Sequence, residues 1–212
     1  MTNAHVVNGC TEHDLYAVTP LGKRLTFSRV VSDPNRDLAA LRPTEKIRGG
    51  LELGLNDDPP LGTTVTTWGF PLIYNGPSPI LCVGYVAGYN AVTVGGRTVK
   101  HIVVNGAFNP GNSGGPVFLS GHSGVIGIVV WKQVLFSTNV PTVIEGFKHP
   151  RLAIGGTFSI RLPDGTSRSV SDQEAIAAVL EEFYDTVQVV IGEAISASEL
   201  KGFLKEQKEN LN

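Results

Sequence analysis

From residue 14 to about residue 162, short apolar runs alternate with turns rich in glycine, proline and aspartate. Apolar runs of this length between turn-forming residues are typical of β-strands. We expect hairpins over residues 14–33, 80–106, 116–131 and 156–170. This part of the chain is therefore predicted to form a mainly β body. The Pro/Asp/Gly connector "GLNDDPPLG" at residues 54–62 is the best candidate for a boundary between two halves of that body.

The spacing of the apolar positions changes after Ser171. Ser171 and Glu174 fit a capping box, in which each side chain satisfies a backbone N–H at the start of a helix. Apolar residues then recur at helical spacing: Ile176, Val179, Leu180, Phe183, Val187 and Ile191. Ser196 and Glu199 repeat the capping pattern before a second apolar group. We therefore predict two C-terminal helices.

The composition indicates a globular protein. Hydrophobic residues make up 42% of the 212 residues and charged residues 17%, which is enough to bury a core. The net charge is −2 and the sequence has no basic run, so nucleic acid and anionic membranes are not expected as partners. No apolar run reaches about 18 residues, so we expect no membrane insertion.

One motif carries candidate chemistry: "GNSGGP", which places Ser113 among glycines. A serine hydroxyl needs a base to remove its proton and fixed donors to hold the oxyanion that forms after attack. Glycines let the chain turn sharply enough for backbone N–H groups to converge. Alone, the motif also fits a glycine-rich turn. The nucleophile elbow of α/β-hydrolases fits poorly, because Pro116 and a strand-like run follow instead of a helix.

Three motifs occur in order: "TNAHVV", "DLAALRP" and "GNSGGPV". The histidine of the first motif, His5, lies 32 residues before the aspartate of the second, Asp37, and Asp37 lies 76 residues before the serine of the third, Ser113. This chain resembles the trypsin-like (chymotrypsin-fold) serine peptidases and is closest in pattern to the HtrA/Do-like branch. "FSIRLP" followed by a helix resembles the end of that family's domain. The resemblance implies a mainly β, chymotrypsin-like double β-barrel, here with C-terminal helices.

The resemblance also implies site residues. By match to the motifs, His5 would be the general base and acid, Asp37 would orient its ring, and Ser113 would be the nucleophile. The N–H groups of Gly111 and Ser113 would form the oxyanion hole. Ala107 would lie at the base of the primary specificity pocket, where an acidic residue would favour Arg or Lys.

A wall of that pocket would come from Ile128, Val129 and Val130, so we expect small or medium aliphatic side chains at the cleavage position. The remaining histidines do not have metal-ligand spacing. No metal and no cofactor are expected, and the expected partners are polypeptide substrates.

The sequence departs from the family at its start. The family places two strands before "TNAHVV", where this chain has Met1. We therefore expect an incomplete N-terminal barrel over residues 1–56, without the strand that positions His5. The C-terminal barrel is predicted over residues 57–170 and a helical extension over residues 171–212.

Three hypotheses stay open at this point. The chain is a truncated serine endopeptidase, or a catalytically impaired fold that binds proteins or peptides, or an enzyme that rebuilds the missing strands from its C-terminal helices or a partner. Self-association through those helices is a further hypothesis. The compartment would be cytoplasmic if Met1 is the true start, and otherwise an upstream export signal would direct the chain elsewhere.

Overall fold

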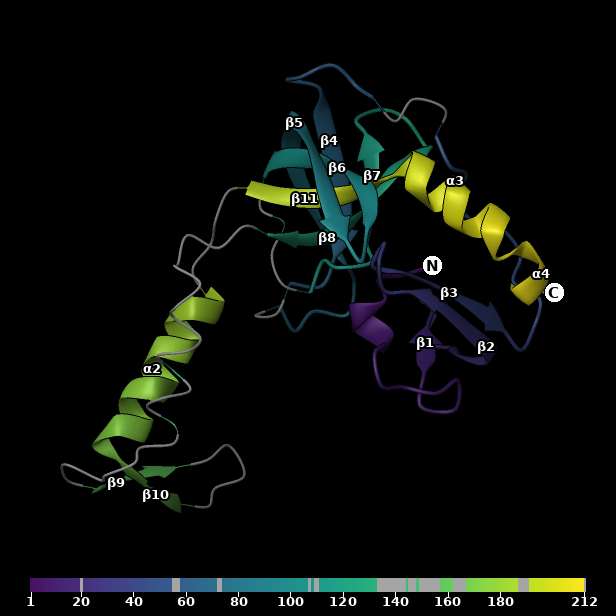
Figure 1. Cartoon of the computed structure of the whole chain (residues 1–212). Helices are drawn as coiled ribbons and strands as arrows, with labels where there is room; N and C mark the ends of the chain where they lie inside the picture. The colour runs from purple at the N-terminus through teal and green to yellow at the C-terminus, as the bar shows by residue number, and fades with distance from the viewer. Residues whose placement is uncertain are drawn as a thin grey trace. The chain divides into compact units, whose positions relative to one another are not determined.

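A computed structural model describes residues 1–19, 21–54, 58–71, 74–106, 108, 111–132, 144, 148, 157–161, 167–186 and 191–211 (Figure 1). The chain divides into two compact units: Met1–Gln133 together with Val190–Asn212, and Val134–Val189. Each unit is described by itself below. The second unit is inserted, in sequence, between two strands of the first.

The N-terminal part of the first unit is a three-stranded antiparallel sheet in the order β1-β2-β3. Its strands are β1 (Tyr16–Val18), β2 (Arg24–Asp33) and β3 (Leu38–Pro43). The hairpin predicted over residues 14–33 is confirmed by the pairing of β1 with β2. Within the described residues this sheet does not close into a barrel, in agreement with the predicted incomplete N-terminal barrel.

No strand precedes His5 among the described residues, but the residues before it are still anchored on this sheet. Thr2 forms an antiparallel bridge with Ala39, with N–H···O distances of 2.9 and 2.8 Å. The chain then enters a short 3-10 helix, η1 (His5–Val7). A single bridge to β3 therefore fixes the start of η1.

A closed six-stranded barrel contains the other strands described in the first unit. Its strands are β4 (Thr64–Gly69), β5 (Ile80–Val94), β6 (Arg97–Gly106), β7 (Pro116–Leu119), β8 (Val125–Lys132) and β11 (Ile191–Ser196), in the order β11-β6-β5-β4-β7-β8. The hairpins β5–β6 and β7–β8 were both predicted and are confirmed. Gly95 and Gly96, with φ of 57° and 79°, make the first of these turns, since left-handed backbone favours glycine.

Two apolar clusters hold the first unit together. One fills the barrel with side chains such as Val65, Ile102 and Ile126. The other joins the barrel to the N-terminal sheet and includes Leu38, Ile195 and Phe203. Burial of these side chains stabilises the fold by about 1.5–3 kcal/mol each.

The segment after β11 forms α3 (Ala197–Glu206) and α4 (Lys208–Leu211), which contact β3 and β2 (Figure 1). The second predicted helix is thus present, but its capping box is not formed. The hydroxyl of Ser196 makes no cap hydrogen bond, and the carboxylate of Glu199 instead binds Arg36 and the backbone N–H of Lys100. Ile191, which we expected on a helix, begins β11.

The second unit contains β9 (Thr157–Arg161) paired with β10 (Ser167–Ser171), followed by α2 (Asp172–Thr186). The capping box at Ser171 is confirmed: Ser171 N–H donates to Glu174 at 2.8 Å, and Glu174 N–H donates to the Ser171 hydroxyl at 3.2 Å. The likeness of "FSIRLP" to the end of the domain was wrong, because β9 pairs with β10 and β11 closes the barrel. No described helix is long and apolar enough to cross a membrane.

Candidate functional site

His5 and Asp37 are held together by two hydrogen bonds. Nδ1 of His5 donates to Oδ2 of Asp37 at 2.7 Å, and the backbone N–H of His5 donates to Oδ1 at 2.9 Å. The carboxylate is half-buried, with 27% of the side chain exposed, and the imidazole is 50% exposed. Because an ionised carboxylate oxygen can only accept, Nδ1 carries the hydrogen of this bond, and in the neutral ring Nε2 is then the nitrogen without a proton.

The turn before β3 gives Asp37 its orientation. Its φ is 55°, in the left-handed region that costs a residue with a side chain about 1–2 kcal/mol. Asn3 donates its side-chain amide to the Asp37 carbonyl at 3.1 Å, and Asp37 N–H donates to the carbonyl of Pro34 at 3.3 Å. These contacts stabilise the strained backbone from both sides.

The loop that carries Ser113 is fastened to β8. Gly114 N–H donates to the carbonyl of Val129, and Val129 N–H donates to the carbonyl of Gly115, both at 2.9 Å. Gly114 has a φ of 82°, and a Cβ at this position would overlap the hydroxyl of Thr2. Glycine is therefore required here for both conformation and space.

Two other N–H groups of this loop are unused. Neither Gly111 nor Ser113 donates its backbone N–H to an acceptor among the residues that the structure describes. Gly111 has a φ of 93°, so the chain turns sharply between the two. Free N–H groups in a glycine-rich turn can bind an anionic oxygen.

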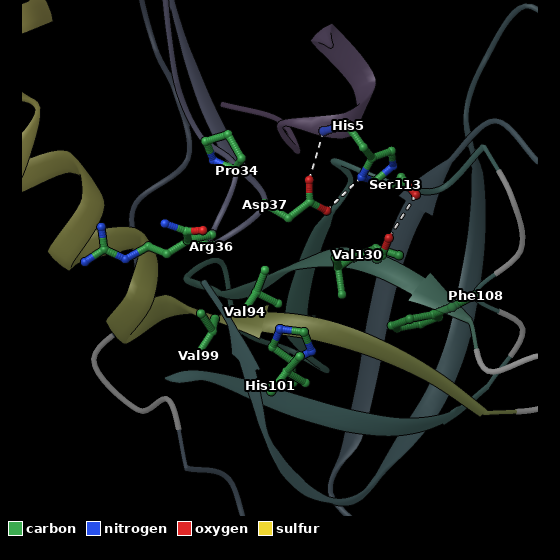
Figure 2. Close-up of a pocket in the computed structure, with 13 residues that line it drawn as sticks. His5, Pro34, Arg36, Asp37, Val94, Val99, His101, Phe108, Ser113 and Val130 are labelled. Atoms are coloured by element: carbon green, nitrogen blue, oxygen red, sulfur yellow. Dashed lines mark hydrogen bonds and ion pairs between the residues drawn. The ribbon is translucent and has the colours of Figure 1, made fainter. Parts of the chain in front are cut away.

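His5, Asp37 and Ser113 line one cavity of about 520 Å³ within the first unit. Figure 2 shows the imidazole of His5 between the carboxylate of Asp37 and Ser113. Apolar side chains form much of the remaining wall: Pro34, Val92, Val94, Val99, Phe108, Val129 and Val130. The cavity thus combines an apolar wall with one small group of reactive side chains, as substrate sites commonly do.

The structure places only some of the predicted pocket residues in the wall of this cavity. Val129 and Val130 line the cavity, whereas Ile128 packs in the cluster that joins the barrel to the N-terminal sheet. Val130 belongs to that cluster as well as to the cavity wall, so simple alternation along β8 does not account for the difference. The pairing of β8 with β11 shifts register between Glu193 and Ala194. Ala107 lies outside the described residues.

The hydroxyl of Ser113 donates to the carbonyl of Val130 at 3.3 Å (Figure 2). Among the described residues it has no hydrogen bond to His5. A bond of this length is weak, so a turn of the Ser113 side chain towards Nε2 of His5 costs little.

Sequence reasoning missed a buried pair of which one member, His101, lines the cavity. Nδ1 of His101 on β6 lies 2.7 Å from Oε2 of Glu193 on β11, and the two side chains are 7% and 1% exposed. Asn90 donates to the second oxygen of Glu193 at 3.2 Å. His101 lines the cavity with Ser113, so it adds a polar group to a mainly apolar lining. No local motif signals this pair, because His101 and Glu193 are 92 residues apart.

Arg36 was also missed, although it directly precedes Asp37. Its side chain is 2% exposed and is paired with Asp33, Glu199 and Glu206. Burial opposes the charge of this guanidinium, but hydrogen bonds to Glu206 and Asp33 outweigh it and raise the pKa of Arg36 above its usual value. Arg36 therefore stays charged under all ordinary conditions.

No group of three or more His, Cys, Asp or Glu side chains among the described residues has the geometry to hold a metal ion. The two cysteines are free, with Cys10 exposed and Cys82 partly buried.

Comparison with known proteins places these features in a family. Residues 1–128 match the trypsin-like peptidase domain. A probable periplasmic serine endoprotease DegP-like from Halomonas elongata is 35% identical over 129 residues, which are 60% of this chain and 26% of that protein. Protease Do-like 1, chloroplastic, from Arabidopsis thaliana is 31% identical over 165 residues, 74% of this chain and 35% of that protein.

Among solved structures, the HtrA-type protease AlgW with a decapeptide aligns over 99% of this chain and 48% of its own, with a TM-score of 0.61 and 21% identity. The chain thus spans about a quarter to a third of the two relatives and about half of this structure. At 21% identity the structural likeness supports the fold.

Proposed function

Because this chain belongs to the trypsin-like peptidase family, we propose that it is a serine endopeptidase that uses a Ser113, His5 and Asp37 triad. The observation that supports this most directly is the cavity that all three side chains line, with the imidazole of His5 already hydrogen-bonded to Asp37. The roles follow from the chemistry of each group.

In the first half of the reaction, Ser113 Oγ attacks the carbonyl carbon of a peptide bond. Its proton passes to Nε2 of His5, and the imidazolium that forms is stabilised by the ionised carboxylate of Asp37. The tetrahedral intermediate then collapses: the C–N bond breaks, Nε2 returns the proton to the leaving amine, and an ester joins the substrate to Ser113.

In the second half, water attacks the ester carbonyl and gives up its proton to Nε2 of His5. Collapse of this second tetrahedral intermediate breaks the ester bond, releases the carboxylic acid and returns the proton to Ser113 Oγ. The enzyme ends the cycle unchanged, and neither a metal nor a cofactor is needed for the atoms to balance.

The N–H groups of Gly111 and Ser113 are the proposed oxyanion donors. Both are without an acceptor among the described residues, while the neighbouring N–H groups of Gly114 and Gly115 are used to hold the loop. Each such donor contributes about 100- to 1000-fold to the rate of acyl transfer.

The proposed substrates are polypeptides. AlgW, a structural neighbour, was solved with a decapeptide. The apolar wall of Phe108, Val129 and Val130 beside Ser113 favours small or medium aliphatic side chains at the cleavage position. A peptide-library cleavage profile tests this, and a profile dominated by Arg or Lys would contradict it.

The decisive experiment is labelling of the 212-residue chain with a fluorophosphonate probe. We expect the wild-type chain to be labelled, the Ser113→Ala variant to remain unlabelled, and the Ser120→Ala variant to be labelled like wild type. Ser120 is a matched control because it lies in the exposed turn after β7.

Labelling that persists in Ser113→Ala would remove Ser113 as the nucleophile. A folded wild-type chain that is not labelled would overturn the endopeptidase proposal and favour the hypothesis of a peptide-binding module. Circular dichroism on the same samples establishes that each variant is folded.

A further inference from the structure

Arg36 reaches from the turn before β3 to the C-terminal helix α3. Its guanidinium donates to both carboxylate oxygens of Glu206, at 2.6 and 2.7 Å, and its Nε donates to Glu199 at 3.4 Å. Both acids lie on α3, and Figure 2 shows the side chain of Arg36 extending towards this helix. A guanidinium that meets a carboxylate through two parallel hydrogen bonds is fixed in orientation as well as in position.

The same side chain is fixed at its own end of the turn. Asp33 accepts from the guanidinium at 3.0 Å and from the backbone N–H groups of Asn35 and Arg36 at 3.0 and 3.2 Å. The turn from Asp33 to Asp37 therefore has few remaining degrees of freedom. Its last residue, Asp37, is the one with the left-handed backbone.

We propose that Arg36 is a positioning residue for Asp37, because it ties the turn that carries this carboxylate to α3 and so keeps the carboxylate on His5. The expected effect of Arg36 on catalysis rests on the proposed function. Its effect on the position of the Asp37 carboxylate does not. Arg36 lines the same cavity as Ser113, but its described ion pairs go to Asp33, Glu199 and Glu206, so the proposed action on the site runs through the position of Asp37.

Attachment of α3 to the rest of the unit does not depend on this arginine. Leu200 and Phe203 are 1% and 0% exposed and fasten the helix to the apolar cluster that joins the barrel to the N-terminal sheet. Ion pairs taken out of water add little net stability, because desolvation offsets their attraction. The ion pairs of Arg36 instead hold the turn in one defined conformation. This matters for the site because the next residue in the turn is Asp37.

The test begins with Arg36→Met and Arg36→Lys in a peptidase assay. Displacement of a catalytic group by about 1 Å costs on the order of 100-fold in rate, so we expect Arg36→Met to lower kcat by about 10- to 100-fold with KM unchanged. Lysine supplies the charge but not the fork of donors, so Arg36→Lys should restore only part of kcat. A fall in kcat at constant KM is expected when an interaction acts in the transition state only.

Arg97→Met is the matched control. Arg97 pairs with the same Glu206 at 3.1 Å, and its side chain is 40% exposed. Among the described residues it forms no ion pair with the turn from Asp33 to Asp37. We expect it to keep wild-type kcat. If Arg36→Met does not fold, Glu206→Gln replaces it, since this change keeps the shape of the side chain and weakens the hold on Arg36.

A second readout does not need activity. The proton on Nδ1 of His5 is observed by NMR while a hydrogen bond slows its exchange with water. We expect this resonance in the wild-type chain and in Arg97→Met, and its loss or broadening in Arg36→Met or Glu206→Gln.

The two proposals can therefore fail separately. If the wild-type chain does not hydrolyse peptides but Arg36→Met loses the His5 resonance, the endopeptidase proposal fails and the positioning role stands. If the wild-type chain is active and a folded Arg36→Met or Glu206→Gln variant keeps both kcat and the resonance, the positioning role is overturned and the endopeptidase proposal stands.

Discussion

Asp37 has a φ of 55° and is the one residue other than glycine, among those the structure describes, with a positive φ. Aspartate and asparagine tolerate this conformation better than other residues with side chains. The same residue accepts two hydrogen bonds from His5. The residue at position 37 therefore has to adopt a left-handed backbone and also supply a carboxylate to His5.

The substitution Asp37→Asn separates these two requirements. Asparagine keeps the left-handed backbone but cannot stabilise an imidazolium, so we expect kcat to fall by about 10,000-fold, a size typical for loss of this carboxylate from a triad. The melting temperature should change little. Steady-state kinetics and thermal denaturation measure the two effects, and a variant with wild-type kcat would show that Asp37 has no catalytic role.

Gly114 and Gly121 make a matched pair for testing the loop of Ser113. Their φ values are 82° and 79°, so replacement of either by alanine should cost about 1–2 kcal/mol for the left-handed backbone. A Cβ at Gly114 would also overlap the hydroxyl of Thr2, whereas one at Gly121 would meet nothing within 4 Å. We expect Gly114→Ala to lose about 1–3 kcal/mol more than Gly121→Ala, as overpacking does.

Urea unfolding of the two variants checks this prediction. Equal losses would mean that Thr2 moves aside freely and that the bridge from Thr2 to Ala39 does not fix the start of η1.

At the scale of single residues, the sequence predicted the candidate triad but not the groups that surround it. His5, Asp37 and Ser113 stand in short motifs that can be recognised locally. Arg36 and Glu206 are 170 residues apart, and His101 and Glu193 are 92 apart. Such pairs depend on how distant strands and helices meet, and no spacing rule within the sequence encodes that.

Among the elements, α3 joins the two parts of the first unit. Leu200 is 1% exposed in the apolar cluster shared by the barrel and the N-terminal sheet. Through this cluster the helix also contacts the strand that follows Asp37. Loss of packing at α3 should therefore weaken the whole unit.

We expect Leu200→Ala to lower the free energy of unfolding by about 2–5 kcal/mol, the cost of an unfilled core position. Leu21→Ala is the control, since Leu21 is 96% exposed in the turn between β1 and β2 and its loss should change stability by about 0.5 kcal/mol or less. Urea unfolding measures both. Similar values for the two variants would contradict the assignment of Leu200 to the core.

The strands with alternating or turn-bounded patterns were predicted, and β11 was not. Five of the six residues of β11, Gly192 to Ser196, are buried, so the strand shows no alternation of polar and apolar positions. It also lies between two helical patterns, and Ile191 coincides with the spacing of the first. Glu199 fitted a capping box, but its carboxylate instead accepts from the charged side chain of Arg36 and the backbone N–H of Lys100.

On the scale of the whole molecule, the second unit is inserted between neighbouring strands. β8 and β11 pair antiparallel, with Gly192 opposite Lys132. Both apolar clusters and all described residues of the candidate site lie in the first unit. The first unit therefore has a core of its own.

We expect a chain in which residues 134–189 are replaced by a short turn containing Asn-Gly to fold, because such a turn joins antiparallel neighbours directly. Circular dichroism and urea unfolding test the fold, and fluorophosphonate labelling tests the site. A shortened chain that is folded but unlabelled would assign the second unit a part in the site. Failure to fold would show that the barrel depends on the second unit.

The position of β11 has a consequence for the chain during its synthesis. The ribosome makes β6 and β8 long before β11, and residues 134–189 come in between. At ordinary rates of translation, this interval lasts roughly 3 to 11 seconds. For that time the barrel has two unpaired edges, which can attract chaperones or other nascent chains, and His101 in the cavity lining is without its partner Glu193. A nascent chain therefore carries Ser113 for several seconds before the barrel beside it can close.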